Sequence, residues 1–194
     1  MRRRTSRFAR CAATILVLAG CRPSGQPDQA AAPDSTIVVP ASAPAQASPR
    51  DTARGTVGSA TVLVDYGRPS RRGREIFGGL VPFDQVWRTG ANSATTIVFG
   101  GPVELGGRSV DAGTYTLYSQ PARNGWTLIV NRQTGQWGTE YDGAQDLVRI
   151  PMEVSRAAVP VDTFTISVES GAPGRLVFAW DTLQGVVTME PRRE

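Results

Sequence analysis

The chain of 194 residues contains no histidine, and all 21 of its basic residues are arginines. The missing imidazole excludes a Ser-His-Asp triad, a Cys-His dyad and a histidine-ligated zinc site. The formal charge of +4 depends on five arginines in the first ten residues; without them, 16 basic residues oppose 17 acidic ones, a charge of −1. This balance argues against a nucleic-acid-binding protein, which needs a concentrated basic face.

Residues 1–20 have the pattern of a bacterial lipoprotein signal peptide. A basic run is followed by an apolar stretch over 11–18 and then by Leu18-Ala19-Gly20-Cys21. An apolar stretch of roughly ten residues is too short for a bilayer, which needs about 20. We expect cleavage before Cys21 and lipidation of its sulfur, with palmitate or a similar N-acyl chain added, so that the remaining chain has no disulfide. An ordinary secretory signal or an uncleaved anchor is the alternative.

Residues 21–49 are rich in proline, alanine, serine and glutamine, a composition with little to bury. This composition predicts a disordered tether between the lipidated Cys21 and a folded domain over 50–194. Arg22 stands where an inner-membrane retention signal often has aspartate, which favours the outer membrane.

The rest of the chain has the pattern of an all-β domain. Short runs rich in valine, isoleucine, threonine and aromatic residues alternate with glycine and proline turns. The pairs Gly106-Gly107 and Asn124-Gly125 suit tight hairpins, and Pro151 places its run at a sheet edge or a bulge. We therefore predict one antiparallel β-sandwich of about 8–10 strands, with a small barrel as the competing closure. At most one or two helical turns are expected over 74–87. The predicted runs are 60–66, 94–99, 102–105, 114–118, 126–131, 147–154, 163–169, 176–180 and 186–190.

One segment is less ordinary than the rest. It is YGRPS from Tyr66, RGREIFGGLVPF from Arg72 and VWRTGAN from Val86, and it is followed by DAGTY, QWG and TFT at 111, 136 and 163. This series of motifs resembles the bacterial family called domain of unknown function 2911, over essentially the whole domain. Phe83 and Asp84 depart from its usual tyrosine and glycine. The resemblance implies an exported or lipid-anchored β protein of unestablished activity, and it transfers no catalytic residue.

The same segment supplies the candidate ligand-binding residues. Arginine forks can clamp a carboxylate, phosphate or sulfate, while amide and hydroxyl groups add directional hydrogen bonds. An exposed tryptophan in the turn over 135–138 could stack on a sugar, whereas Trp126 and Trp180 lie in strand patterns and should be buried. The alternative is structural: the arginines brace the loop, with Arg88 paired to Asp65 or Asp84. The candidates are Arg68, Ser70, Arg74, Arg88, Thr89, Asn92 and Trp137.

The sequence thus favours an envelope lipoprotein whose domain is a non-catalytic binding or interaction module. Its expected partners are the membrane, through the lipid on Cys21, a small anionic or carbohydrate ligand and an envelope protein; no nucleic acid, metal or cofactor is indicated. The alternatives are a glycosidase-like hydrolase, which would pair Asp65 with Glu75 or Asp84, and a purely structural envelope component.

Overall fold

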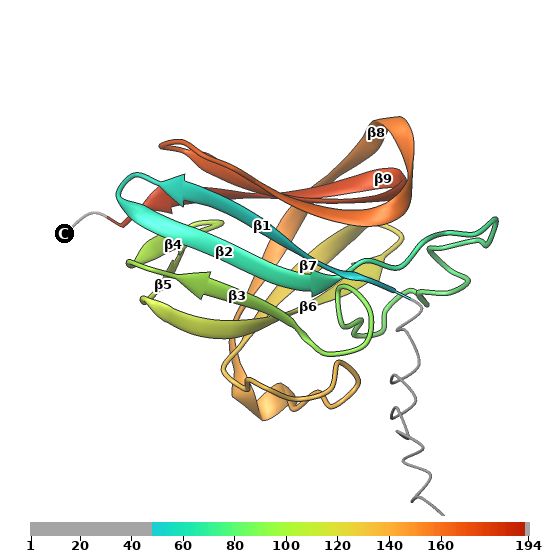
Figure 1. Ribbon diagram of the computed structural model, residues 1–194, viewed down its shortest axis with the longest axis horizontal. Helices are drawn as coiled ribbons and strands as arrows, with labels where there is room; N and C mark the ends of the chain where they lie inside the picture. Colours follow the sequence, from blue (N-terminus) through green and yellow to red (C-terminus); the bar gives the residue numbers. More distant parts are fainter. Residues whose placement is uncertain (1–47, 193–194) are drawn as a thin grey trace, which may run out of the picture. The chain divides into compact units, whose positions relative to one another are not determined.

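The computed structural model describes residues 48–192, which form a sheet of nine antiparallel strands. The strand order is β1-β2-β3-β6-β7-β8-β9-β4-β5 (Figure 1). The predicted signal peptide, Cys21 and nearly all of the tether lie outside these residues. The strands are β1 (Arg50–Val57), β2 (Ala60–Gly67), β3 (Thr95–Phe99), β4 (Val103–Leu105), β5 (Arg108–Val110), β6 (Gly113–Ala122), β7 (Gly125–Asn131), β8 (Asp146–Glu169) and β9 (Gly174–Pro191).

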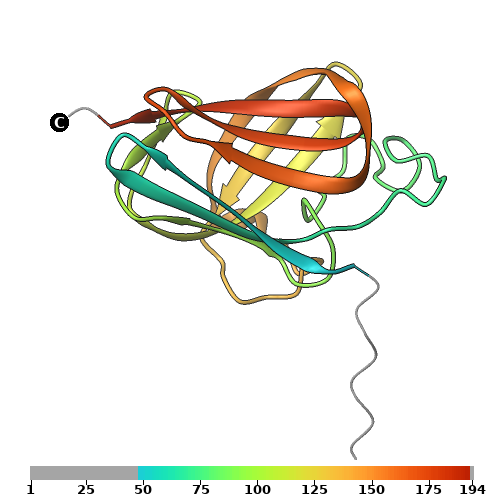
Figure 2. The same ribbon diagram turned by 45° about the horizontal axis from the view of Figure 1, so that its top comes forward.

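The sheet folds over on itself into two layers, which gives the predicted β-sandwich-like, all-β domain. The long strand β8 belongs to both layers, because it pairs with β7 up to Met152 and with β9 from Glu153 onward. Figures 1 and 2 show β8 and β9 lying over the layer that holds β1, β2 and β3. Gly171, in the turn after β8, exchanges backbone hydrogen bonds with the end of β1, so the layers also meet at that edge.

Residues that alternate along the strands fill the space between the layers. Val62, Val64 and Tyr66 of β2 are all buried, and so are Phe164 and Ile166 of β8. This period of two is the one expected for strands with a single buried face. The burial predicted for Trp126 and Trp180 is confirmed at 5% and 1% exposure.

The structure corrects the sequence prediction in the long strands. The runs 147–154 and 163–169 belong to one strand, β8, and the runs 176–180 and 186–190 both lie in β9. Between residues 153 and 160 nearly every residue of β8 is exposed, because the strand crosses there from one layer to the other. No core lies against that stretch, so the apolar alternation that defines a strand in sequence disappears.

Three smaller features of the fold are compared with the sequence analysis in turn. Strand β1 was not predicted, because Val57 is its one fully buried residue and its composition is polar. The sequence allowed at most one or two helical turns over 74–87, and that part of the described chain forms none: it is an irregular loop with turns. Pro151 fits its predicted place at a sheet edge. Its part of β8 pairs with β7 on one side, and pairing with β9 begins only at Glu153, so no hydrogen bond is required from Pro151 on the other side.

Among residues 48–192, the single helical element is the 3₁₀ turn η1 (Gly143–Gln145). No helix in that range is long and apolar enough to cross a membrane.

Candidate functional site

A 27-residue connection between β2 and β3 covers one end of the sandwich (Figure 1). It is tied to both layers. Phe164 N donates to Pro69 O (2.9 Å), and Trp87 exchanges backbone hydrogen bonds of 2.7 and 2.9 Å with Ser119 of β6. Ile76 and Val81 are fully buried and anchor the loop by packing into the hydrophobic core. The loop is therefore a rigid part of the domain, and the side chains along it have defined positions.

The backbone of this loop is strained. Arg72, Asp84, Thr89 and Asn92 all have positive φ, and the remaining non-glycine residue of this kind in the described chain is Asp181. Thr89 is the least ordinary, because a β-branched residue rarely adopts φ near 52°. Such residues cost about 1–3 kcal/mol each and concentrate at functional sites.

Buried hydrogen bonds hold Thr89 in place. Its hydroxyl donates to Ser119 Oγ at 3.0 Å, and its carbonyl accepts from Thr95 Oγ1 at 2.7 Å. Thr89 is 1% exposed. The neighbouring Arg88 is consequently presented from a fixed piece of backbone.

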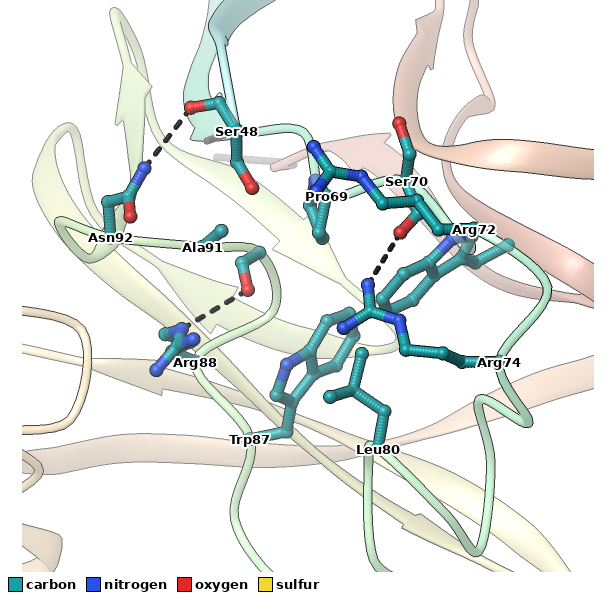
Figure 3. Close-up of a pocket in the computed structure, with 12 residues that line it drawn as sticks. Ser48, Pro69, Ser70, Arg72, Arg74, Leu80, Trp87, Arg88, Ala91 and Asn92 are labelled. Atoms are coloured by element: carbon teal, nitrogen blue, oxygen red, sulfur yellow. Dashed lines mark hydrogen bonds between the residues drawn. The ribbon is translucent and has the colours of Figure 1, made fainter. Parts of the chain in front are cut away.

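The loop and the middle of β9, at Trp180, border a cleft of about 290 Å³ (Figure 3). Trp87 and Trp180 supply its aromatic wall, with ring centroids 5.7 Å apart and planes inclined by 17°. Two contacts with β8 hold Trp180 in place: its Nε1 donates to Asp162 O at 3.1 Å, and Phe164 packs against its ring. The cleft is lined by Ser48, Pro69, Ser70, Arg72, Arg74, Leu80, Trp87, Arg88, Gly90, Ala91, Asn92 and Trp180.

The cleft is positively charged. Arg72, Arg74 and Arg88 all line it, and no carboxylate of residues 48–192 does. Arg74 donates to the carbonyls of Ser70 (2.7 Å) and Arg71 (3.0 Å), and Arg88 Nε donates to Gly90 O (3.3 Å). Neither Arg74 nor Arg88 forms an ion pair with a residue of the described range 48–192. Backbone carbonyls orient these two guanidinium groups without neutralising them.

Four of the seven predicted site residues meet in this cleft: Ser70, Arg74, Arg88 and Asn92. In Figure 3 the Asn92 amide donates to Ser48 O, and Arg74 and Arg88 are drawn on opposite sides of the Trp87 ring.

The other three predicted residues lie elsewhere. Arg68 braces the strands: it pairs with Asp51 (2.9 Å) and donates to Phe164 O and Thr165 Oγ1. Thr89 is buried behind the cleft, as described above. Trp137 is 45% exposed, as expected, but it does not line the cleft.

Several lining residues were not among the sequence candidates. Trp87 and Leu80 belong to the same segment as the arginines, and the 45% exposure of Leu80 is what sets it apart from the buried Ile76 and Val81. Trp180 lies about ninety residues further along the chain, in a strand pattern that signals burial. Nothing in the sequence indicates that one edge of this core residue borders a cleft.

The carboxylates proposed for a hydrolase do not line this cleft. Asp65 is paired with Arg50 at the surface, and neither Glu75 nor Asp84 is among the lining residues. The Ser70 hydroxyl is hydrogen-bonded to Thr163 Oγ1 (3.0 Å), so no acid-base partner accompanies it. Within residues 48–192, no group of three or more cysteine or acidic side chains is placed to hold a metal ion.

Fold and cleft together define an all-β domain with an arginine-lined cleft at one end. The family described as "Protein of unknown function (DUF2911)" matches residues 48–189. The chain belongs to this family, and the resemblance noted in the sequence is thereby confirmed. No curated protein and no solved structure matches the chain.

Proposed function

We propose that the domain is a non-catalytic module that binds a small anionic ligand in this cleft. The observation that carries the proposal is the placement of Arg74 and Arg88 at one cleft, with no lining carboxylate and no ion pair within the described residues. Guanidinium groups oriented by backbone carbonyls, with their remaining N–H groups available, suit a carboxylate, phosphate or sulfate.

The same structure contains an arginine that serves the fold, and the contrast is informative. Arg68 donates from each of its three side-chain nitrogens, to a carboxylate, a carbonyl and a hydroxyl from two strands. Among the residues that the structure describes, Arg74 and Arg88 are hydrogen-bonded to carbonyls of their own loop alone. A purely structural role would leave both of these charges at one cleft without a counter-ion among the described residues, which is unfavourable.

The side chains that line the cleft suit binding better than catalysis. The chain contains no histidine, and the cleft has no carboxylate to act as an acid or base. Arginine remains protonated in proteins, so it can orient a ligand and stabilise its charge but is a poor proton donor.

The experiment is a thermal-shift comparison of acetate, phosphate, sulfate and glucuronate against chloride at constant ionic strength. A ligand at ten times its Kd should add about 1.4 kcal/mol to the free energy of unfolding. Sulfate and phosphate also stabilise proteins by exclusion from the surface. The double variant Arg74→Met/Arg88→Met therefore provides the baseline, and Arg175→Met, at an exposed pair with Glu169, is the matched control.

At least one anion should raise the midpoint of the wild type and of Arg175→Met, and should lose that effect in the double variant. Equal shifts in all three proteins, or no shift with any anion, would remove the basis of the proposal.

We also propose that the domain is exported and lipid-anchored to the bacterial cell envelope through Cys21. This proposal is supported by Leu18-Ala19-Gly20-Cys21 behind a basic and apolar leader. Lipidation with more than one chain would give the stable attachment that a single chain does not.

A further inference from the structure

A second cavity, of about 170 Å³, lies next to the arginine-lined cleft. Trp87 and Arg88 line both spaces, so the two share one wall. The first cleft alone lies just below the roughly 300–1,000 Å³ that small-molecule sites occupy, and the two spaces together fall within that range. The second cavity is lined by Val86, Trp87, Arg88, Tyr118, Gly138, Thr139 and Tyr141.

The shared wall depends on a close approach between two loops. Gly138 N donates to Asn92 O at 3.0 Å. A Cβ atom at Gly138 would lie 2.6 Å from both Arg88 Cδ and Asn92 O, closer than real Cβ contacts. Glycine therefore lets the loop over 132–145 touch the base of the Arg88 side chain. Since Arg88 makes a single hydrogen bond within residues 48–192, through Nε, no residue of that range engages its terminal N–H groups, which can face a ligand along this wall.

The second cavity offers aromatic surface and few charged groups. The rings of Tyr118 and Tyr141 meet edge to face with centroids 4.8 Å apart. Their hydroxyls are already engaged: Tyr118 donates to Glu140 O (3.2 Å), and Tyr141 donates to Asp146 Oδ2 (2.7 Å).

Both tyrosines stay neutral at physiological pH. Burial raises the pKa of Tyr118, and burial together with the Asp146 carboxylate raises the pKa of Tyr141 to about 12. Tyr118 is 1% exposed and supports Tyr141 from behind, so a ligand in this cavity meets the partly exposed rings of Tyr141 and Trp87, the exposed Thr139 and the Arg88 guanidinium.

Resting on the proposed function, we propose that the ligand is an acidic disaccharide. Its anionic sugar occupies the arginine-lined cleft, and the adjoining uncharged sugar occupies the second cavity beyond Arg88. The chemistry fits on both sides of the wall, because sugar rings present apolar faces to aromatic side chains and hydroxyl groups to arginine, serine and threonine. The first cleft provides Trp87 with Ser48 and Ser70, and the second provides the partly exposed Tyr141 with Thr139.

The test compares glucuronate with cellobiuronic acid, in which the same acidic sugar is joined to glucose, by isothermal titration calorimetry. Cellobiuronic acid should bind the wild type at least tenfold more tightly. Thr139→Trp, which fills the second cavity from an exposed position, should abolish this gain and leave glucuronate binding unchanged. Thr114→Trp, at an exposed position of β6, is the control and should keep the gain.

Two results would overturn the inference while leaving the proposed function intact. One is equal affinity for cellobiuronic acid and glucuronate. The other is a gain that survives Thr139→Trp, which would place the second sugar elsewhere. If 4-nitrophenyl glucuronide instead showed the Thr139-dependent gain and cellobiuronic acid did not, the second cavity would belong to an aromatic group and the disaccharide assignment would be wrong. The proposed function itself would fail only in the anion comparison described above.

Discussion

Replacing Arg68 with methionine should destabilise the domain without weakening anion binding. Methionine keeps much of the apolar stem and removes the guanidinium with its three contacts. These are an ion pair with Asp51 at 2.9 Å and hydrogen bonds to Phe164 O and Thr165 Oγ1 at 3.2 and 3.0 Å. The contacts join the start of the loop to β1 and β8, so their loss loosens the end of the sandwich that carries the cleft.

The magnitude follows from the exposure of each contact. The Arg68 and Asp51 side chains are 31% and 46% exposed, so solvent reduces their ion pair to about 0–1 kcal/mol. The two partly buried hydrogen bonds contribute about 0.5–1.5 kcal/mol each. Arg68→Met should therefore lower the free energy of unfolding by about 1–4 kcal/mol. Arg74→Met removes two exposed bonds to loop carbonyls and should cost less than about 1 kcal/mol.

Urea denaturation followed by tryptophan fluorescence measures this difference, since Trp180 and Trp126 are buried and report loss of the core. The anion thermal-shift assay on the same two variants measures whether each one still binds an anion. Arg68→Met should keep the anion response and lose stability, and Arg74→Met should do the reverse. A stable Arg68→Met protein that no longer responds to anions would refute the assignment of Arg68 to the fold and of the cleft to Arg74 and Arg88.

Three further predictions concern other parts of the chain. Tyr66→Phe removes a hydroxyl that accepts from Ile166 N (3.0 Å) in the core, so it should cost about 1–3 kcal/mol in urea denaturation; an unchanged midpoint would contradict it. Because the pKa of Tyr141 rises from 10.0 to about 12 on folding, its stabilising contribution is complete below pH 10 and is lost between pH 10 and 12. Tyr141→Phe should therefore flatten the fall in stability over that range, and an equally steep fall would count against the shift. Cys21→Ser should abolish incorporation of labelled lipid precursor, and persistent labelling would place the modification elsewhere.

The fold was predictable where local pattern and tertiary environment agree. Strand β2 lies over the core along its whole length, so its alternation is visible in the sequence, and β7 shows as a short apolar run because four consecutive residues are buried. Prediction failed in β1, a polar edge strand, and in the crossing part of β8, which has no core beneath it. Strand β1 is held by its hairpin partner β2, and the crossing part of β8 is held by β9. This backbone pairing leaves no trace in the local side-chain pattern of either stretch.

The site was predictable in the same limited way. Ser70, Arg74, Arg88 and Asn92 fall in one glycine-rich segment, and its length and polarity indicated a functional loop. The roles of the individual arginines were not predictable. Arg68 differs from Arg74 because Asp51 and the Phe164 carbonyl happen to reach it from β1 and β8, which only the folded sheet reveals.

Two independent costs meet at the cleft, and together they favour a binding site over a bracing loop. The first is backbone strain, which is greatest at the β-branched Thr89 and is maintained by buried hydrogen bonds to Ser119 and Thr95. The second is electrostatic, because Arg74 and Arg88 face one space without a carboxylate among its lining residues. A loop needed only for closure could avoid both costs with ordinary turn residues and a neutral side chain. An anion bound between the guanidinium groups would offset the second cost, and the first would keep Arg88 in place for it.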